Sequence, residues 1–161
     1  MLAKSALEDL RDIVSRKSIE RCELPTAVQQ WQREAFNRPH DAGIALSWHF
    51  DANGATISLH ESQHAQLRRM LREVLSNAIL HSVAATQISV EIIASHNRIA
   101  ISVTNDGVTE PASNWQTGRG ISNLRIRSRD LQGDFSIRDN TVGEVRVSWS
   151  IPLHSHSGSP Q

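Results

Sequence analysis

The strand-like segments of this sequence come in pairs, and this order constrains the fold more than any other feature. Each segment is short, and it either alternates apolar with polar residues or is rich in β-branched residues. The six segments are 44–50, 55–59, 88–93, 99–103, 135–138 and 145–151. Short polar connections join the members of each pair at Asp51–Gly54, Ser95–Arg98 and Asp139–Gly143, which predicts three hairpins.

Helical spacing of apolar residues separates the strand pairs. The four expected helices cover 2–14, the segment from Pro25 to a stop at Pro39 and Gly43, 63–82 with Ser62 as N-cap, and 121–131. Strands therefore do not alternate singly with helices, as a doubly wound fold requires. We predict an α+β fold, a two-layer α/β sandwich with a largely antiparallel sheet and its helices on one side.

Length and charge narrow the function classes. A chain of 161 residues is long enough for one domain with its own core. Lys+Arg and Asp+Glu balance at 17 each, so no overall field attracts nucleic acid or a membrane surface. No run approaches the roughly 20 apolar residues that span a bilayer, and the single Cys22 suits a reducing compartment. We expect a cytoplasmic domain, on its own or as the cytosolic part of a membrane-bound sensor.

A row of polar side chains lies on the long helix. Glu73, Asn77 and His81 are spaced four residues apart, which places them on one face beside the apolar stripe. A carboxylate, an amide and an imidazole are poor material for a core, although a solvated helix face would also explain them. A zinc site is disfavoured, because one His and one Glu are too few ligands.

Two further features follow along the chain. Asn105-Asp106-Gly107 ends a strand, where a carboxylate can accept from an exocyclic amine and a glycine lets a flat ring approach; a common turn would look the same. Gly118 and Gly120 stand at the start of a helix, whose free N–H groups favour phosphate. Neither a Walker loop nor a Rossmann fingerprint is present.

The order of these motifs resembles the Bergerat-type ATPase fold shared by gyrase, Hsp90, histidine kinases and MutL, and more closely histidine kinases of the nitrate-sensor type. The matching segments are Leu71–Ala84, Asn105–Gly107, Gly118–Arg127, Leu131–Gly133 and Ile151–Leu153. They cover roughly 62–153, and Ala6–Val14 resembles the end of a dimerisation helix. The resemblance implies three parts: residues 1–20 as the end of that linker helix, 21–153 as the ATP-binding catalytic domain, and 154–161 as a disordered tail.

The resemblance also implies roles for single residues. Asn77 would be the side-chain ligand of Mg²⁺, with Glu73 and His81 near the phosphates as catalytic groups. Asp106 would accept from the adenine amine, with Gly107 making room for the base. Gly118 and Gly120 would give N–H groups to the phosphates, and Arg125 or Arg127 would add positive charge. Glu144 departs from the family pattern, since an acidic residue near phosphates would weaken nucleotide binding.

The resemblance implies a histidine protein kinase that uses ATP and Mg²⁺, yet the chain offers no convincing acceptor histidine. His40 precedes Asp41, but Arg38-Pro39 argues against a helix interior there. The acceptor would therefore lie on a separate dimerisation domain, with a response regulator receiver domain as an indirect partner. Two alternatives remain open: a stand-alone serine kinase of the anti-sigma-factor type, and a degenerate domain that only binds a partner.

Overall fold

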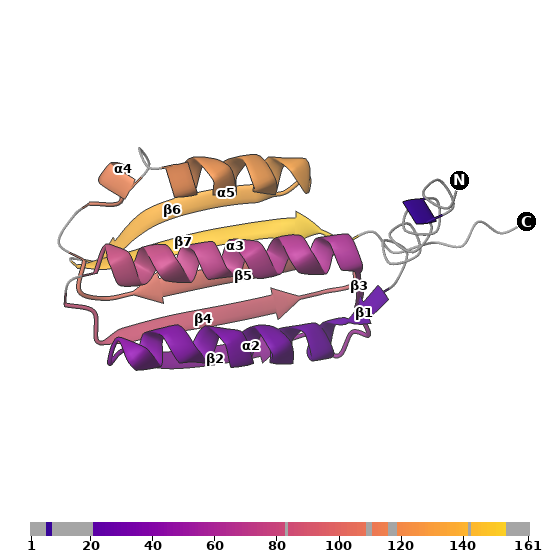
Figure 1. The fold of residues 1–161 in the computed structure, drawn as a ribbon, viewed down its shortest axis with the longest axis horizontal. Coiled ribbons are helices and arrows are strands. Elements are labelled where there is room, and N and C mark those ends of the chain that lie inside the picture. The colour runs from indigo at the N-terminus through magenta and orange to yellow at the C-terminus, as the bar shows by residue number, and fades with distance from the viewer. Residues whose placement is uncertain are drawn as a thin grey trace, which may run out of the picture.

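The computed structural model describes residues 6–7, 21–82, 84–108, 111–115, 119–141 and 143–153. Most of the helix expected over 2–14, and the tail 154–161, lie outside these described residues. From residue 21 the elements are β1 (Arg21–Glu23), α2 (Leu24–Asp41), β2 (Ala45–Asp51), β3 (Ser58–His60), α3 (Glu61–Leu80), β4 (Gln87–Ala94), β5 (Arg98–Asn105), α4 (Ala112–Trp115), α5 (Arg119–Asp130), β6 (Asp134–Thr141) and β7 (Glu144–Pro152) (Figure 1).

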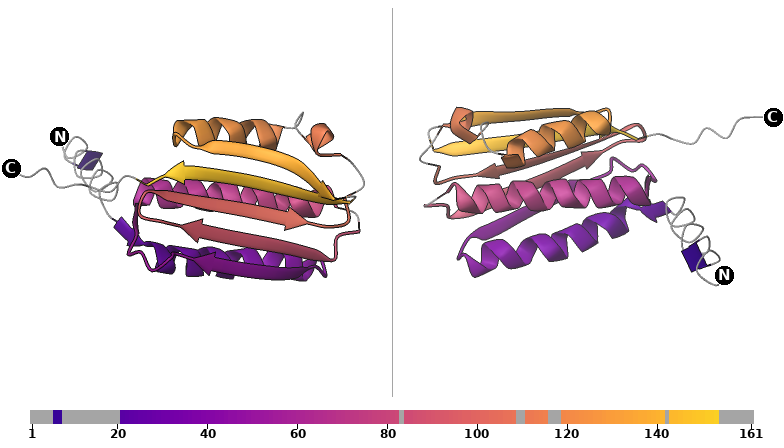
Figure 2. Two further views of the ribbon diagram at one scale, coloured as in Figure 1. Left: turned by 180° about the vertical axis from the view of Figure 1, so that it is seen from behind. Right: turned by 45° about the horizontal axis from the view of Figure 1, so that its top comes forward.

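Two layers make up the domain. A five-stranded sheet has the order β2-β4-β5-β7-β6, in which only the β2–β4 pair is parallel and the other three pairs are antiparallel. Helices α2, α3 and α5 lie side by side over one face of this sheet, and no helix or strand of the described residues covers the other face (Figure 2). The predicted α+β two-layer sandwich with a mixed, largely antiparallel sheet is confirmed.

The core lies between α3 and the sheet. The apolar stripe predicted on the long helix is buried, as expected from its spacing; its members are Leu67, Met70, Leu71, Val74, Leu75 and Ala78. Alternate residues of the central strands face it, because side chains of a strand point to opposite faces in turn; they include Ile88, Val90, Ile92, Ile101, Val147 and Trp149. No helix among the described residues is long and apolar enough to cross a membrane.

The hairpin predicted over 44–59 is wrong, although its turn is present. Asn53 and Gly54 have φ of 51° and 74°, which reverses the chain as expected. The strands on either side then pair elsewhere: β2 runs parallel to β4, and β3 pairs with the three-residue β1. Alternation of apolar residues predicts that a segment is a strand but does not specify its partner. The other two hairpins, β4–β5 and β6–β7, are confirmed.

The termini of two helices also differ from expectation. Pro25 stands in the first turn of α2 as predicted, but Pro39 lies inside the helix, which ends at Asp41. The carbonyl of Pro39 still accepts from the N–H of Ile44 at 2.8 Å, so the last turn stays bonded. His40 is therefore in a helical turn after all, contrary to the sequence argument.

Helix α3 begins one residue before the predicted N-cap. Its N-cap is His60 and its first residue is Glu61, so Ser62 is already helical. The main-chain N–H of His60 donates to Oε1 of Gln63 at 3.2 Å, which is half of a capping box. The helix ends at Leu80, and the segment expected as a loop before α5 contains the short α4, whose Ala112 N–H donates to Asp139 Oδ1 of β6 at 3.0 Å.

Candidate functional site

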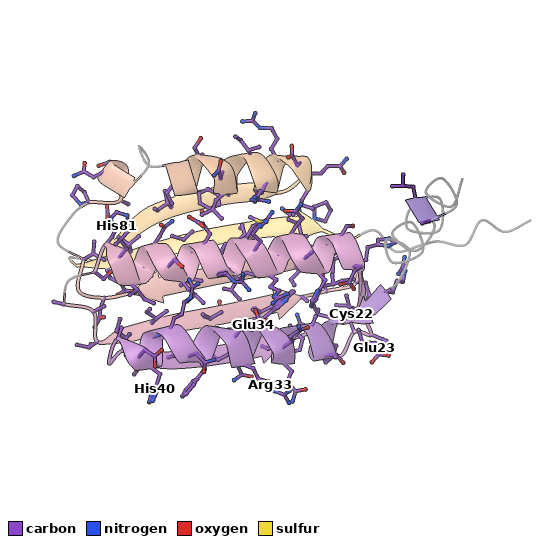
Figure 3. All side chains as sticks on the ribbon, viewed as in Figure 1. Cys22, Glu23, Arg33, Glu34, His40 and His81 are labelled. Carbon is purple, nitrogen blue, oxygen red and sulfur yellow. The ribbon has the colours of Figure 1, made fainter. Side chains whose placement is uncertain are left out.

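The polar row of α3 points toward the start of α5. Glu73 and Asn77 are both half-buried on α3. His81 caps the C-terminal end of the helix, where its N–H donates to the Asn77 carbonyl at 2.9 Å. Figure 3 shows His81 at that end, one residue beyond α3. The structure therefore places Glu73 and Asn77 side by side beside Gly120, and His81 at the C-terminal end of the same helix.

Gly120, in the first turn of α5, lies against this row. A Cβ at Gly120 would lie 2.5 Å from Glu73 Oε1 and 3.3 Å from Asn77 Nδ2. Only a residue without a side chain allows this approach unless Glu73 moves. The N-terminal end of α5, whose first N–H groups have no partner within the helix, thus stands beside a carboxylate and an amide. Gly118 lies outside the described residues.

Asn77 carries the clearest sign that this corner is built for a ligand. Its Nδ2 is buried and has no hydrogen-bond partner among the described residues. Buried polar atoms nearly always have a hydrogen-bond partner, so an unpaired nitrogen of this kind indicates that a bound molecule supplies the acceptor. The oxygens of Asn77 and Glu73 are of the hard type that Mg²⁺ prefers.

A metal ion at this corner would need ligands from elsewhere. Within the part of the chain that the structure describes, no group of three or more His, Cys, Asp or Glu could hold a metal ion. Mg²⁺ typically takes one or two protein ligands and completes its shell with water and phosphate oxygens. The donor set of α3 fits such a shared site, and it does not fit a metal centre made by protein alone.

A second corner forms where β5 ends, around Asp106. Its Oδ1 accepts from the main-chain N–H groups of Thr86 at 2.8 Å and Gln87 at 3.0 Å. Its Oδ2 accepts from the Thr86 hydroxyl. That hydroxyl, followed by the Gln87 N–H, holds the pKa of Asp106 below its ordinary value. Asp106 is therefore ionised at neutral pH and held in one orientation.

The backbone of neighbouring residues packs closely against this corner. Gly107 has φ of 70°, and a Cβ there would lie 2.3 Å from the backbone of Ala84 and Ala85. The buried Asn105 donates through Nδ2 to Ser82 Oγ at 2.5 Å, which ties the end of β5 to the segment after α3. Asp106 and Gly107, predicted as neighbours of a base, thus sit in a rigid corner one short segment from Asn77.

The two predicted arginines are not brought to Gly120. The Arg125 guanidinium lies 5.2 Å from the ring centroid of Phe135, on the β6 side of α5. Arg127 donates to Gln66 at 2.8 Å, and Gln66 stands on α3 roughly 10 Å before Glu73 at the usual helical rise. Both side chains are engaged with protein away from the Glu73–Asn77 row.

Glu144 lies at the other corner from the one expected. It is the first residue of β7, which runs antiparallel to β5, so it comes beside the end of β5. The carbonyl of its neighbour Gly143 accepts from the Val108 N–H at 3.0 Å. Glu144 therefore borders the Asp106 corner and not the Gly120 corner, because antiparallel pairing places the start of one strand at the end of the other.

Sequence reasoning missed Thr86 and Ser82. Thr86 supplies two of the three donors to Asp106, and Ser82 accepts from Asn105. Thr86 stands in no motif, and Ser82 lies within the matching segment Leu71–Ala84 but was given no role there. The pairing of β4 with β5, which brings residues 86 and 87 beside Asp106, gives the signal for Thr86.

Comparison with known proteins agrees with this arrangement. Residues 62–155 match the family described as Histidine kinase-, DNA gyrase B-, and HSP90-like ATPase. The chain is 27% identical over 129 residues to the signal transduction histidine-protein kinase/phosphatase UhpB of Salmonella typhimurium, covering 80% of this chain and 24% of that protein. It is 33% identical over 101 residues to the sensor histidine kinase ComP of Bacillus subtilis, covering 61% of this chain and 13% of that one.

Other relatives and solved structures extend this picture. The nitrate/nitrite sensor protein NarX of Escherichia coli is 28% identical over 92 residues, which cover 56% of this chain and 15% of NarX. The catalytic domain of histidine kinase ThkA superposes with a TM-score of 0.65 at 16% identity, over 83% of this chain and 96% of that structure. The histidine kinase domain of a blue-light activated kinase from Erythrobacter litoralis gives 0.60 at 19% identity, over 79% and 61%. The chain spans a quarter or less of each of these three curated relatives.

Proposed function

The chain belongs to the histidine kinase-, DNA gyrase B- and HSP90-like ATPase family, and from that premise we propose that it binds MgATP and presents the γ-phosphoryl group to a histidine on a separate dimerisation domain. The relatives UhpB and ComP, both named histidine kinases, favour this activity over a stand-alone serine kinase. They are about four or more times longer than the matched region, so the acceptor domain is assigned to a different part of such a protein.

One observation carries the proposal: Gly120 at the start of α5 stands against Glu73 and against the unpaired amide of Asn77. A helix N-terminus attracts phosphate, and a buried amide without a partner favours a ligand beside it. In this assignment the α5 N–H groups hold phosphate oxygens. Asn77 offers one ligand to Mg²⁺, with Glu73 and His81 on the same rim.

The second corner supports the same assignment. Asp106 is ionised and half-buried, and it can accept from the exocyclic amine of adenine. Gly107 presents bare backbone beside it, where a planar base can approach. The segment 82–87 connects this corner to the end of α3, so the base and the phosphates would bind at opposite ends of one short segment.

Phosphoryl transfer demands positioning and charge neutralisation more than covalent chemistry from the protein. Mg²⁺, when bound, neutralises charge on the phosphates. The chain's own contribution is to hold the nucleotide by its base at Asp106 and to orient its phosphates between α3 and α5. Arg125 and Arg127 have no part in this assignment, because both are engaged elsewhere.

A calorimetric titration tests the binding half of the proposal. The chain should bind ATP, and affinity should rise when Mg²⁺ is added. Failure to bind ATP with Mg²⁺ present would contradict the proposal outright.

A labelling experiment tests the transfer half. Incubated alone with ATP labelled on its γ-phosphate, the chain should retain no alkali-stable label, and label should appear when a dimerisation domain bearing a histidine is supplied. Because His40 lies beside Asp41 in a helical turn, the variant His40→Gln is the matched control. If the chain alone takes up stoichiometric label and the variant does not, the acceptor histidine is His40 in this domain, which contradicts the proposal. Label on a serine of the partner would favour the anti-sigma-type activity.

A further inference from the structure

Helix α3 lies between α2 and α5 and carries three arginines, which face different neighbours (Figure 1). Arg68 and Arg72 turn toward α2, where their guanidinium nitrogens lie 2.7 Å and 3.5 Å from the carboxylate oxygens of Glu34. Arg69 is exposed, and it makes no hydrogen bond or ion pair with any residue that the structure describes. Among these three arginines, only Arg69 has a guanidinium that the described residues leave unpaired.

The position of Arg69 on the helix places it on the α5 side. Gln66, Arg69 and Glu73 follow one another at steps of three and four residues, so they share one face of α3. Gln66 accepts a hydrogen bond from Arg127 of α5 at 2.8 Å. Glu73 lies against Gly120 at the start of α5. Arg69 stands between these two contacts, about 6 Å along the helix axis from Glu73.

The nucleotide of the proposed function would lie along α3 in one direction. Its base would bind beyond the C-terminal end of the helix, at the Asp106 corner, and its phosphates would bind beside Asn77, Glu73 and Gly120. The path from the base to the phosphates therefore leads back along α3, toward the N-terminal half of the helix. The outermost phosphate is then the one nearest to Arg69, which lies one helical turn beyond Glu73.

We propose that Arg69 binds the γ-phosphate of the nucleotide and so distinguishes a triphosphate from a diphosphate. This inference rests on the proposed function, and it adds the positive charge that Arg125 and Arg127 do not supply. A guanidinium can donate two parallel hydrogen bonds to phosphate oxygens, and such charge-assisted bonds are stronger than neutral ones. Neutralising charge on the transferred phosphate is also what phosphoryl transfer demands of the protein.

The carboxylate of Glu73 is the reason that a cation is needed here. A carboxylate and a phosphate repel each other when they lie close together. Arg69 precedes Glu73 by four residues, the spacing of a helical ion pair, yet no ion pair joins them in the described structure. The order with the cation first is the less favourable one for such a pair. The guanidinium therefore stays available to a phosphate and can offset this repulsion.

Calorimetric titration of the full chain with ATP and with ADP, both with Mg²⁺ present, tests the inference. Arg69→Ala should weaken ATP binding by on the order of tenfold, the usual range for hydrogen bonds to a charged group, and leave ADP binding nearly unchanged. Arg69→Lys keeps the charge but loses the paired donors, so its loss of ATP affinity should be smaller.

Arg72→Ala is the matched control, because it removes the same charge from the α2 side of the same helix. It should change the two affinities equally and by less than about threefold, since a screened surface charge acts weakly at a distance.

Three results would overturn the inference: an equal loss for ATP and ADP in Arg69→Ala, no loss for either nucleotide, or the same selective loss of ATP binding in Arg72→Ala. Arg69→Ala should fold normally, because residue 69 is exposed on a helix and alanine favours helices, and urea denaturation verifies this. A wild-type chain that binds neither nucleotide would instead refute the proposed function, on which this inference rests.

Discussion

The two corners of the site are built in opposite ways. Around Asp106 the chain satisfies its own polar groups, with three donors on one carboxylate and main chain packed behind Gly107. Around Asn77 the described residues leave the buried amide nitrogen without a partner, and the three atoms nearest to a Cβ at Gly120 belong to side chains. The Asp106 corner is preorganised, whereas the corner between α3 and α5 leaves Asn77 Nδ2 without a partner among the described residues.

Because of this difference, the two corners should contribute different properties to ligand binding. A preorganised acceptor gives specificity, because it cannot adjust to a base with the wrong pattern. An incomplete corner gives dependence on the ligand: phosphate oxygens can accept from the amide nitrogen of Asn77, and the amide oxygen can bind Mg²⁺. Substitutions at the first corner should therefore change the stability of the fold or the choice of base, and substitutions at the second should change the response to Mg²⁺.

The largest effect is expected for Gly107→Ala. Its Cβ would lie 2.3 Å from the backbone at Ala84–Ala85, and its φ of 70° is unfavourable for any L-residue. We expect the free energy of unfolding to fall by about 2–4 kcal/mol, from backbone strain and overpacking together. Urea denaturation followed by circular dichroism measures this.

Gly54→Ala is the matched control for that variant. Gly54 has φ of 74° but nothing within 4 Å of an added Cβ. It should cost only about 1–2 kcal/mol, the strain of the backbone alone. Equal losses in the two variants would mean that the corner behind Gly107 is not rigid, and the comparison of the two corners would fail.

Asn77→Ala should affect binding and leave the fold intact. The substitution removes an unpaired buried amide, so no hydrogen bond within the described residues is lost at Nδ2. Binding of ATP should lose its dependence on Mg²⁺, while unfolding by urea changes by less than about 1 kcal/mol, as is usual away from packed or bonded groups. A variant whose ATP affinity still rises on adding Mg²⁺ would remove Asn77 from the metal site.

Gly120→Ala should be milder than Gly107→Ala, although both glycines look equally crowded. The nearest atom at Gly120 is Glu73 Oε1, the end of a flexible side chain that can move. Alanine also favours a helix over glycine by about 0.5–1 kcal/mol. Stability should stay within about 1 kcal/mol of wild type, and ATP affinity should fall because the methyl group fills the space beside Asn77. Severe unfolding would show that this corner is as rigid as the other.

The smallest effect is a shift in titration. The Thr86 hydroxyl is the largest cause that lowers the pKa of Asp106 from its ordinary value of 3.8. A depressed pKa stabilises the fold at pH values above 3.8, and this contribution is lost as pH falls through the lower native pKa. In Thr86→Val the pKa should rise toward 3.8, which carbon-13 NMR of the Asp106 carboxyl detects. An unchanged pKa would show that the main-chain amides alone hold the carboxylate.

The sequence predicts elements better than it predicts their partners. Long periodic segments such as 63–82 became helices, and the β-branched runs became β4 and β5, since local patterning determines both. The pairing of 44–50 with 55–59 was wrong, because β2 finds its partner in β4 across the whole of α3. Strand β1 was missed, because three residues with one apolar side chain show no period.

The same distinction between local motifs and contacts across the fold holds for the site residues. Glu73, Asn77, Asp106, Gly107 and Gly120 were named from motifs, and the structure gathers Glu73 with Asn77 and Gly120. Arg125 and Arg127 share a helix with Gly120, yet Arg125 faces Phe135, and Arg127 lies about two turns further along and contacts Gln66. Thr86 belongs to no motif, since its importance arises only when β4 and β5 pair. A single sequence therefore does not predict contacts between residues that strand pairing brings together.

The parallel pairing of β2 with β4 bears on how fast the domain assembles. Ala45 pairs with Gln87 although β3 and α3 lie between them in the sequence, whereas β4 and β5 are joined by the short connection at 95–97. Contacts between distant parts of a chain form slowly, because the loop between them must be closed first. We expect the β4–β5 hairpin, which carries Asp106 at its end, to form early on the folding pathway. Substitutions in β2 should then speed unfolding with little change in the folding rate, which stopped-flow kinetics would measure.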